Sequence, residues 1–189
     1  MTVFHQPSGQ FTVYDSTTPA VEPDLSTPLL QAVVALESQI RNNKTGETGA
    51  FFDETGVVVV QRQGLPDQVS FQDVPTFMLV GRLFTHNHPG GAGFSLRDVR
   101  SAASLQLIEL RVVTPIMRYR LAPQPGVLWP SPDQITAVFT HESAIATSRA
   151  FRMNTRGELN LAYTDFEIRH LSWKAVAKRF NLTYIQEKS

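Results

Sequence analysis

The sequence predicts an α+β fold in which helices flank one mixed or antiparallel sheet. Apolar residues recur at helical spacing in several separated segments, and short apolar runs typical of strands lie between these segments. The resulting order is helix, strands, strand–loop–helix, strands, helix. This order differs from the repeated βαβ order of a parallel sheet, and 189 residues are enough to bury one core.

The first helix is expected to begin at Pro28. Thr27 is a favourable N-cap residue, and proline is favoured at the first helical position. Apolar residues from Leu29 to Ile40 then recur near positions i, i+3, i+4 and i+7, and the helix should stop within residues 41–46. The preceding residues are rich in Ser, Thr, Pro and Asp, so we expect irregular chain there, with a short strand at 10–15.

Several strands should follow this helix. They are expected at 48–53, 57–63, 68–71 and 82–86. The run Val57–Val60 shows no polar alternation, which favours a central strand buried on both faces. Residues 53–56 fit a turn, and residues 73–81 fit either a short helix or an irregular apolar link.

The second half of the chain should continue with helices and a hairpin. Helices are expected at 95–107, 132–151 and 166–181, and strands at 109–115, 117–123 and 182–186. The two strands around Pro115 should form a hairpin, and Trp129 and Trp173 should pack in the core. The apolar positions expected to face inward in the second of these helices are Ile135, Val138, Phe139 and Ile145.

Composition divides the chain into three segments. We expect an irregular N-terminal segment at 1–27, the main domain at 28–150 and a basic helical extension at 151–189. The net charge is zero overall, but residues 1–148 carry −4 and residues 149–189 carry +4. The basic segment either docks on an acidic surface or presents a solvated helix face, and both interpretations stay open.

Several protein classes are disfavoured by composition. The chain has no cysteine, which excludes disulfides, thiolate zinc ligands and thiol nucleophiles. It has no apolar run of about 18 residues and no evident signal peptide, so we expect a cytoplasmic protein without a membrane span. Balanced overall charge gives no indication of a nucleic-acid partner.

The stretch LFTHNHPGGAGFSLRDV, residues 83–99, carries the clearest chemical signal. Side chains two residues apart in an extended chain point the same way, so His86 and His88 can aim at one point. Asp98 follows across a glycine-rich turn that can fold back, and it is the expected third ligand. Two imidazoles and one carboxylate leave a coordination position for water, as in catalytic zinc sites.

A zinc hydrolase of this kind also needs a general base. Glu37, Glu47 and Glu54 are the candidates, and Glu47 stands at the start of an expected strand, where it would be held rigidly. Ser95, just before a helix, could donate a hydrogen bond to a developing oxyanion. The residues expected to orient the ligands are Thr85 and Asn87.

Some of these residues also have a purely structural interpretation. Ser95-Leu96-Arg97-Asp98 fits a capping box, which needs no metal and would still hold Asp98 in place. The remaining histidines lack neighbouring ligand types, and we expect them at the surface or hydrogen-bonded in the core. These are His5, His141 and His170.

The combination of an upstream glutamate, His-x-His-Pro and Ser-x-x-Asp resembles the motif of the JAMM (MPN+, or JAB) metallopeptidases. Within THNHPGGAGFSLRD, the string HNHP in particular resembles the bacterial RadC-like branch. The segment Glu47–Leu121 also resembles JAB-like domains of phage-associated and bacterial toxin-like proteins. One difference is the spacing, because nine residues separate His88 from Asp98 here and ten are usual in the family.

The resemblance implies a cytidine-deaminase-like α/β sandwich with a curved mixed sheet flanked by helices. It implies zinc bound by His86, His88 and Asp98, with Glu47 as general base and Ser95 stabilising the tetrahedral intermediate. The implied activity is hydrolysis of peptide or isopeptide bonds in proteins, including bonds next to ubiquitin-like proteins. Two alternatives stay open, a non-catalytic binding module of this fold and a toxin-like or phage-associated domain with another cellular target. The oligomeric state is not indicated.

Overall fold

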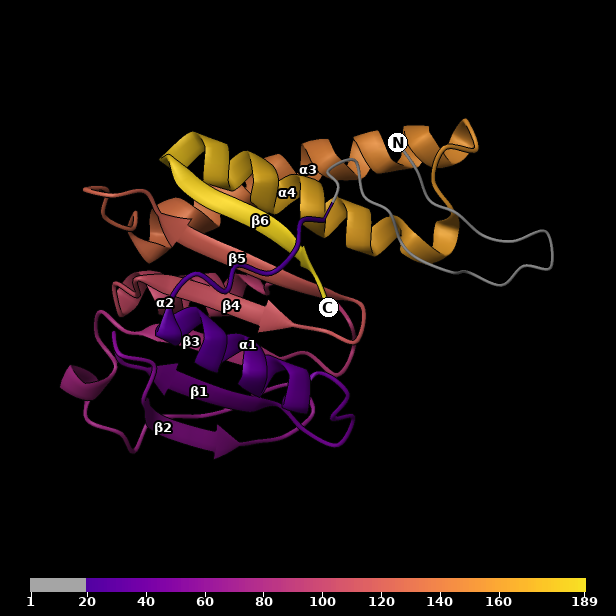
Figure 1. Ribbon diagram of the computed structural model, residues 1–189. Coiled ribbons are helices and arrows are strands. Elements are labelled where there is room, and N and C mark those ends of the chain that lie inside the picture. Colours follow the sequence, from indigo (N-terminus) through magenta and orange to yellow (C-terminus); the bar gives the residue numbers. More distant parts are fainter. Residues whose placement is uncertain (1–19) are drawn as a thin grey trace.

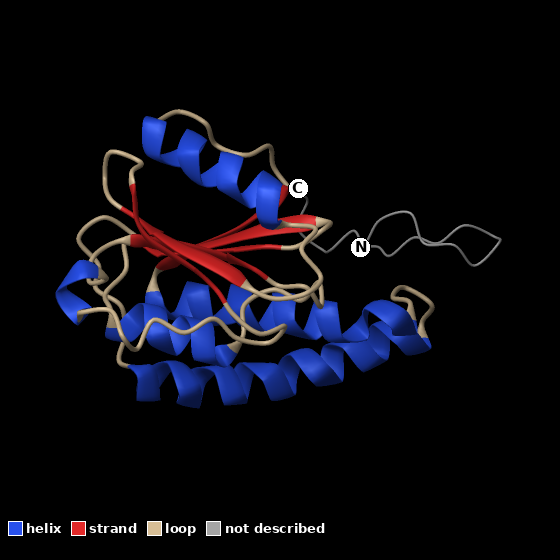
Figure 2. Ribbon diagram, turned by 90° about the horizontal axis from the view of Figure 1, so that it is seen from below, coloured by secondary structure: helices blue, strands red, loops and turns tan. Residues whose placement is uncertain are grey.

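The computed structural model describes residues 20–189, which form a six-stranded sheet with helices on both faces (Figures 1 and 2). The elements are α1 (Pro28–Ile40), β1 (Thr48–Phe52), β2 (Val58–Gln63), β3 (Leu83–Asn87), α2 (Leu96–Ser104), β4 (Glu109–Val113), β5 (Met117–Pro123), α3 (Pro132–Thr155), α4 (Thr164–Phe180) and β6 (Leu182–Lys188). Short 3-10 turns occur at Thr76–Met78 and Leu161–Tyr163. The α+β class is confirmed, while the strand expected at 10–15 lies outside the described residues.

The sheet is mixed, with the strand order β2-β1-β3-β4-β5-β6. Strands β3 and β4 are parallel and are connected through α2, and the other neighbouring strands are antiparallel. The expected hairpin around Pro115 is confirmed as β4 and β5. Because β3 and β4 run in parallel, their carboxyl ends lie side by side at the start of α2.

Two hydrophobic cores lie on opposite faces of the sheet. On one face, Val33 of α1 packs against Ala50, Phe52 and Leu83. On the other face, α2, α3 and α4 cover the larger core, which includes both tryptophans as expected. Alternation along each strand separates the two cores, so that Phe51 packs with the larger core while its neighbours face α1.

The valine run is not a central strand, and that prediction was wrong. Strand β2 forms the edge of the sheet, with Val57 60% and Val58 42% exposed. The buried position beside it belongs to β1, all five residues of which are buried. A run of valines is compatible with an edge strand as well as with a central strand, so the run alone does not determine the position of β2 in the sheet.

Other expectations need smaller corrections. Residues 68–71 form no strand, and only an isolated bridge joins Leu65 to Gln68. Helix α3 continues to Thr155, and Ile145 on it is 51% exposed instead of facing the core. The predicted boundary after residue 150 falls inside α3, and β6 pairs with β5 in the same sheet. Throughout residues 20–189 we find no helix with the length and hydrophobicity that a bilayer crossing requires.

A buried ion network joins α1 to the sheet. Glu37 of α1 and Arg111 of β4 are fully buried, and Nε and Nη2 of Arg111 donate to the two Glu37 oxygens at 2.7 and 3.1 Å. Arg111 also donates to Glu109 at 2.9 Å and to Glu187 at 2.7 Å. Burial alone would lower the pKa of Arg111, but these three carboxylates raise it above its ordinary value.

Two further arginines complete this network. Nε of Arg118 lies 3.0 Å from Oε2 of Glu37, and Arg120 donates to both Glu109 and Glu187. Three arginines therefore face three glutamates, and the buried charges are balanced. Such pairing compensates the desolvation of each charge, so that removing one member leaves another uncompensated.

We expect Glu37→Gln to lower the free energy of unfolding by about 3 kcal/mol, because the buried Arg111 guanidinium loses its bidentate partner. Urea denaturation measures this. The matched control is Asp73→Asn, since Asp73 is 70% exposed and pairs with Arg62 at the surface. The control should change stability by less than about 1 kcal/mol. A loss in Glu37→Gln no larger than that in the control would contradict the role of the network.

Helix α4 buries two ionisable groups whose pKa shifts oppose each other. Burial raises the pKa of Glu167 to about 7 and lowers that of His170 to about 4. Glu167 therefore stabilises the fold fully below about pH 4.5, and this contribution is lost as the pH rises to about 7. His170 stabilises the fold fully above about pH 6.5, and its contribution is lost as the pH falls to about 4.

We expect opposite pH profiles for the two glutamine variants. The stability advantage of the wild type over His170→Gln should shrink as the pH falls from 6.5 to 4, by at most about 3 kcal/mol. The advantage over Glu167→Gln should shrink as the pH rises from 4.5 to 7. Urea denaturation across this range measures both, with His141→Gln on the exposed surface as the control for a histidine outside the core. If stability changed with pH in the same direction for both variants, the opposite pKa shifts of Glu167 and His170 would be contradicted.

Candidate metal centre

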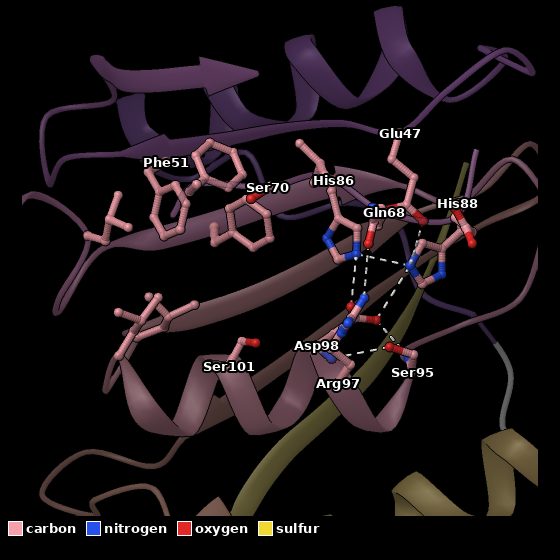
Figure 3. A pocket seen from close by; sticks show the side chains of 18 of the residues that line it. Glu47, Phe51, Gln68, Ser70, His86, His88, Ser95, Arg97, Asp98 and Ser101 are labelled. Carbon is pink, nitrogen blue, oxygen red and sulfur yellow. Dashed lines mark hydrogen bonds and ion pairs between the residues drawn. The ribbon is translucent and has the colours of Figure 1, made fainter. Parts of the chain in front are cut away.

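The two histidines of the motif converge at the carboxyl end of β3. His86 lies within the strand and His88 directly after it, and both face the side of the sheet covered by α2 (Figure 3). Their Nε2 atoms are 2.9 Å apart. The backbone N–H of His88 donates to the Val113 carbonyl at 2.9 Å, which fixes the histidine pair to the end of β4.

Asp98 reaches the histidines from the first turn of α2. One of its oxygens lies 3.5 Å from Nε2 of His86 and the other 3.4 Å from Nε2 of His88. Asp98 also accepts from the Ser95 N–H at 2.7 Å, and the Ser95 hydroxyl accepts from the Asp98 N–H at 3.2 Å. The expected capping box is therefore present, and it holds the carboxylate at the histidine pair.

The loop between His88 and α2 is short, and its backbone contacts His88 at several points. Gly91 takes a φ of 78° and donates its N–H to the His88 carbonyl at 3.0 Å. Gly93 has another role, since a Cβ there would lie 3.3 Å from the Tyr119 ring. With nine intervening residues, the loop still brings Asp98 within 3.5 Å of both imidazole nitrogens.

The loop also sets the tautomer of His88. Its Nδ1 lies 2.9 Å from the Ala92 carbonyl oxygen and 3.2 Å from that of Gly93. Carbonyl oxygens only accept, so Nδ1 carries a proton, and Nε2 is the ring nitrogen that faces the site. His86 lacks such support, because its buried Nδ1 has no hydrogen-bond partner within residues 20–189. Its ring is instead stacked on Phe84, with centroids 5.1 Å apart.

Glu47 approaches the same point from the segment between α1 and β1. Its Oε1 lies 3.7 Å from Nε2 of His88. The Glu47 N–H donates to the Leu65 carbonyl at 2.9 Å, and its carbonyl accepts from the Gly64 N–H at 2.8 Å. The backbone of Glu47 is thereby fixed to the chain that follows β2.

Asn87 positions the segment that carries Glu47. Its side-chain oxygen accepts from the Thr48 N–H at 2.6 Å, and its amide nitrogen donates to the carbonyls of Asn43 and Gly46 at 3.1 and 3.3 Å. Asn87 is fully buried on the face of β3 opposite His86. It therefore acts on the site through the segment that carries Glu47.

The other candidates from the sequence lie elsewhere. Thr85 points to the α1 face and donates to Glu37 at 2.8 Å, so both belong to the ion network. Glu54 is exposed in the turn between β1 and β2. Of the three candidate bases, Glu47 is the one that meets the histidines. His141 is exposed and His170 is buried near the Tyr184 hydroxyl, whereas His5 lies outside the described residues.

The charges of the site stabilise one another. Burial would raise the pKa of Asp98, but the charges and hydrogen bonds of His86 and His88 hold it well below its ordinary value. Burial raises the pKa of Glu47, although the two histidines oppose this shift. Burial works against a charged His88, yet Asp98 and the Ala92 carbonyl raise its pKa. The site therefore combines one firmly ionised carboxylate with a second that binds a proton more readily.

This arrangement fits a bound metal ion. The ligand atoms of Glu47, His86 and His88 all lie within 4.8 Å of one another, so this buried set could hold a cation. Tetrahedral zinc with bonds of about 2.0–2.1 Å places neighbouring ligand atoms about 3.3 Å apart, close to the distances from Asp98 to both imidazoles. With neutral imidazoles, the two carboxylates bring two negative charges, which a divalent cation would balance.

The site opens into a cavity of about 560 Å³ between the sheet, α2 and the chain that follows β2. At one end the cavity is lined by Glu47, His86, His88, Ser95 and Asp98 (Figure 3). Arg97 donates to Gln68 at 3.3 Å and so joins α2 to the opposite side of the cavity. Sequence reasoning missed the apolar wall at the other end, because its residues come from separate elements and each alone looks like core.

Comparisons of the chain with protein-family models, with curated proteins and with solved structures find no match. A functional interpretation therefore depends on the geometry of the site and on the motif that the site contains.

We expect Asn87→Ala to loosen the segment around Glu47, because Asn87 makes three hydrogen bonds to that segment. Hydrogen exchange of the Thr48 amide should accelerate, and stability should fall by about 1–3 kcal/mol. The control Asn160→Ala removes a hydrogen bond to the Ala162 amide, far along the chain, and should leave Thr48 unaffected. Unchanged exchange at Thr48 in Asn87→Ala would contradict this positioning role.

Proposed function

We propose that the chain is a zinc-dependent hydrolase of peptide or isopeptide bonds of the JAMM type. The observation that carries this proposal is the convergence of two imidazoles and two carboxylates at the end of one cavity. The proposal includes a cytoplasmic enzyme that acts on proteins, among them substrates linked to ubiquitin-like proteins. It also includes the cytidine-deaminase-like arrangement, which the mixed sheet with helices on both faces supports.

In this proposal His86, His88 and Asp98 hold the metal. The distances from Asp98 to both Nε2 atoms support this choice, and so does the low pKa of its carboxyl group. When bound, zinc would act as a Lewis acid and lower the pKa of a water molecule towards about 7. The capping box and the carbonyls that bind Nδ1 of His88 keep two of the three ligands in place before any metal arrives.

Glu47 is the proposed general base. It lies on the far side of His88 from the capping box, and burial raises its pKa towards the range in which a carboxylate accepts and returns protons. It takes a proton from water as the water oxygen adds to the substrate carbonyl carbon. The same proton then passes to the leaving amine as the carbon–nitrogen bond breaks.

Ser95 is the proposed donor to the developing oxyanion. Its oxygen accepts from the Asp98 N–H, which leaves the hydroxyl hydrogen available to a substrate in the cavity. It stands at the N-terminus of α2, where the helix dipole favours negative charge. Ser95 would therefore stabilise the transition state more than the ground state.

Metal analysis tests the ligand assignment. We expect about one zinc ion per chain by mass spectrometry, and its loss in His88→Ala and in Asp98→Asn. The matched control is His141→Ala on the exposed surface of α3, which should keep its zinc. Full zinc occupancy in His88→Ala would contradict the assignment of His88 as a metal ligand.

Glu47→Gln separates the base from the ligands. This variant should retain zinc and lose about 10²–10⁴-fold in peptide or isopeptide hydrolysis, whereas the exposed Glu54→Gln should keep full activity. If Glu47→Gln lost zinc and Asp98→Asn kept it, the two carboxylates would have exchanged roles. Zinc loading without hydrolysis of any peptide or isopeptide in a broad panel would instead favour a non-catalytic binding module.

A further inference from the structure

The far end of the cavity has a different character from the metal end. Moving away from the histidines, the cavity wall becomes apolar, and aromatic rings gather around Phe51 (Figure 3). The residues that form this apolar end are Phe51, Phe71, Leu79, Phe84, Leu105 and Leu107. They come from β1, β3, the turn after α2 and the chain between β2 and β3, so the wall exists only in the folded protein.

Ring contacts connect this wall directly to the metal ligands. The Phe84 ring stacks on His86 with centroids 5.1 Å apart, and Phe51 stacks on Phe84 at 4.4 Å. Phe71 meets both phenylalanines edge-on, at 5.0 and 5.6 Å. A group bound against these rings would therefore lie immediately beside the candidate metal centre.

The charged groups that line the cavity leave the apolar end free for an uncharged occupant. Glu47 and Asp98 stand at the histidine end, and Arg97 is held by Gln68 across the cavity. The fourth charged lining residue, the exposed Asp67, lies close enough to Glu47 for its charge to raise the pKa of that carboxyl group. A volume of about 560 Å³ is in the range of sites that enclose a small molecule or several side chains. A glycine residue has no side chain to cover the aromatic wall, whereas a phenylalanine or leucine side chain would bury apolar surface against it.

We infer that the apolar end is a specificity subsite for a bulky apolar side chain, aromatic or branched aliphatic, on a residue next to the bond that is cleaved. This inference rests on the proposed function. Phe51, Phe71 and Phe84 form the contact surface. The preference it creates over glycine is about 10- to 100-fold.

Binding to the metal-free full chain tests the subsite independently of catalysis. The probes are N-acetyl-phenylalanine amide and N-acetyl-glycine amide, followed by heteronuclear NMR. The phenylalanine probe should shift amides of β1, β3 and α2 and bind at least about 10-fold more tightly than the glycine probe. Equal binding of the two probes, or shifts confined to other parts of the chain, would overturn the inference.

Two variants at the cavity and one control locate the effect. Ser101 is exposed on α2 and lines the cavity between its two ends, so Ser101→Trp should fill the space and abolish the preference for the phenylalanine probe. Phe71→Ala should weaken that probe by removing one ring of the wall. Phe77→Ala removes a ring that is 80% exposed and does not line the cavity, and it should leave binding unchanged.

Hydrolysis by the zinc-loaded protein then separates this inference from the proposed function. Quenched fluorescent peptides would carry phenylalanine, leucine, aspartate or glycine on either side of the cleaved bond. On one side, kcat/KM should be at least about 10-fold higher for phenylalanine or leucine than for glycine, and Ser101→Trp should reduce this ratio. Selective binding without any hydrolysis would refute the proposed function alone. Fastest cleavage of glycine-containing peptides would refute the specificity subsite alone.

Discussion

Side-chain alternation along β3 is the constraint on which the rest of the structure depends. On one face of this strand, Thr85 and Asn87 bind the ion network and the segment that carries Glu47. On the other face, Phe84 and His86 line the cavity. A shift of one residue in the pairing of β3 would exchange these two sets. Its pairing with β1 and β4 therefore holds the site and the attachment of α1 in one register.

Two groups of buried charges lie on opposite faces of the sheet and differ in balance. Around Arg111, three arginines meet three glutamates, and the charges are neutralised by the chain itself. Around the histidines, two carboxylates meet imidazoles that can be neutral, and their nearest basic partners are those rings. The first group is complete without further ions, which is why Glu37 serves structure. The second brings carboxylate oxygens and imidazole nitrogens close to one point, and such a set could hold a cation.

Short-range sequence patterns predict many of the helix caps and turns of this fold. The cap at Thr27, the capping box at Ser95 and the hairpin around Pro115 are short-range patterns, and the structure shows all of them. The period of two also predicts that His86 and His88 share one face. The same period places Thr85 and Asn87 on the opposite face, away from the ligands that they were expected to orient. Burial of β2, the choice among three glutamates and the apolar wall all depend on which distant segments meet, and no local pattern encodes that.

The loop from His88 to Asp98 affects the order in which α2 folds and a metal ion binds. The chain lacks cysteine, so no disulfide can link β3 to α2. An ion shared by His88 and Asp98 would tie these elements together as a cross-link, closing a short ring whose entropic cost is small. Because Asp98 is presented only when the first turn of α2 has formed, such a cross-link could close only after that turn is in place. Metal uptake would then be a late step of folding, and the capping box would keep the start of α2 in place after metal release.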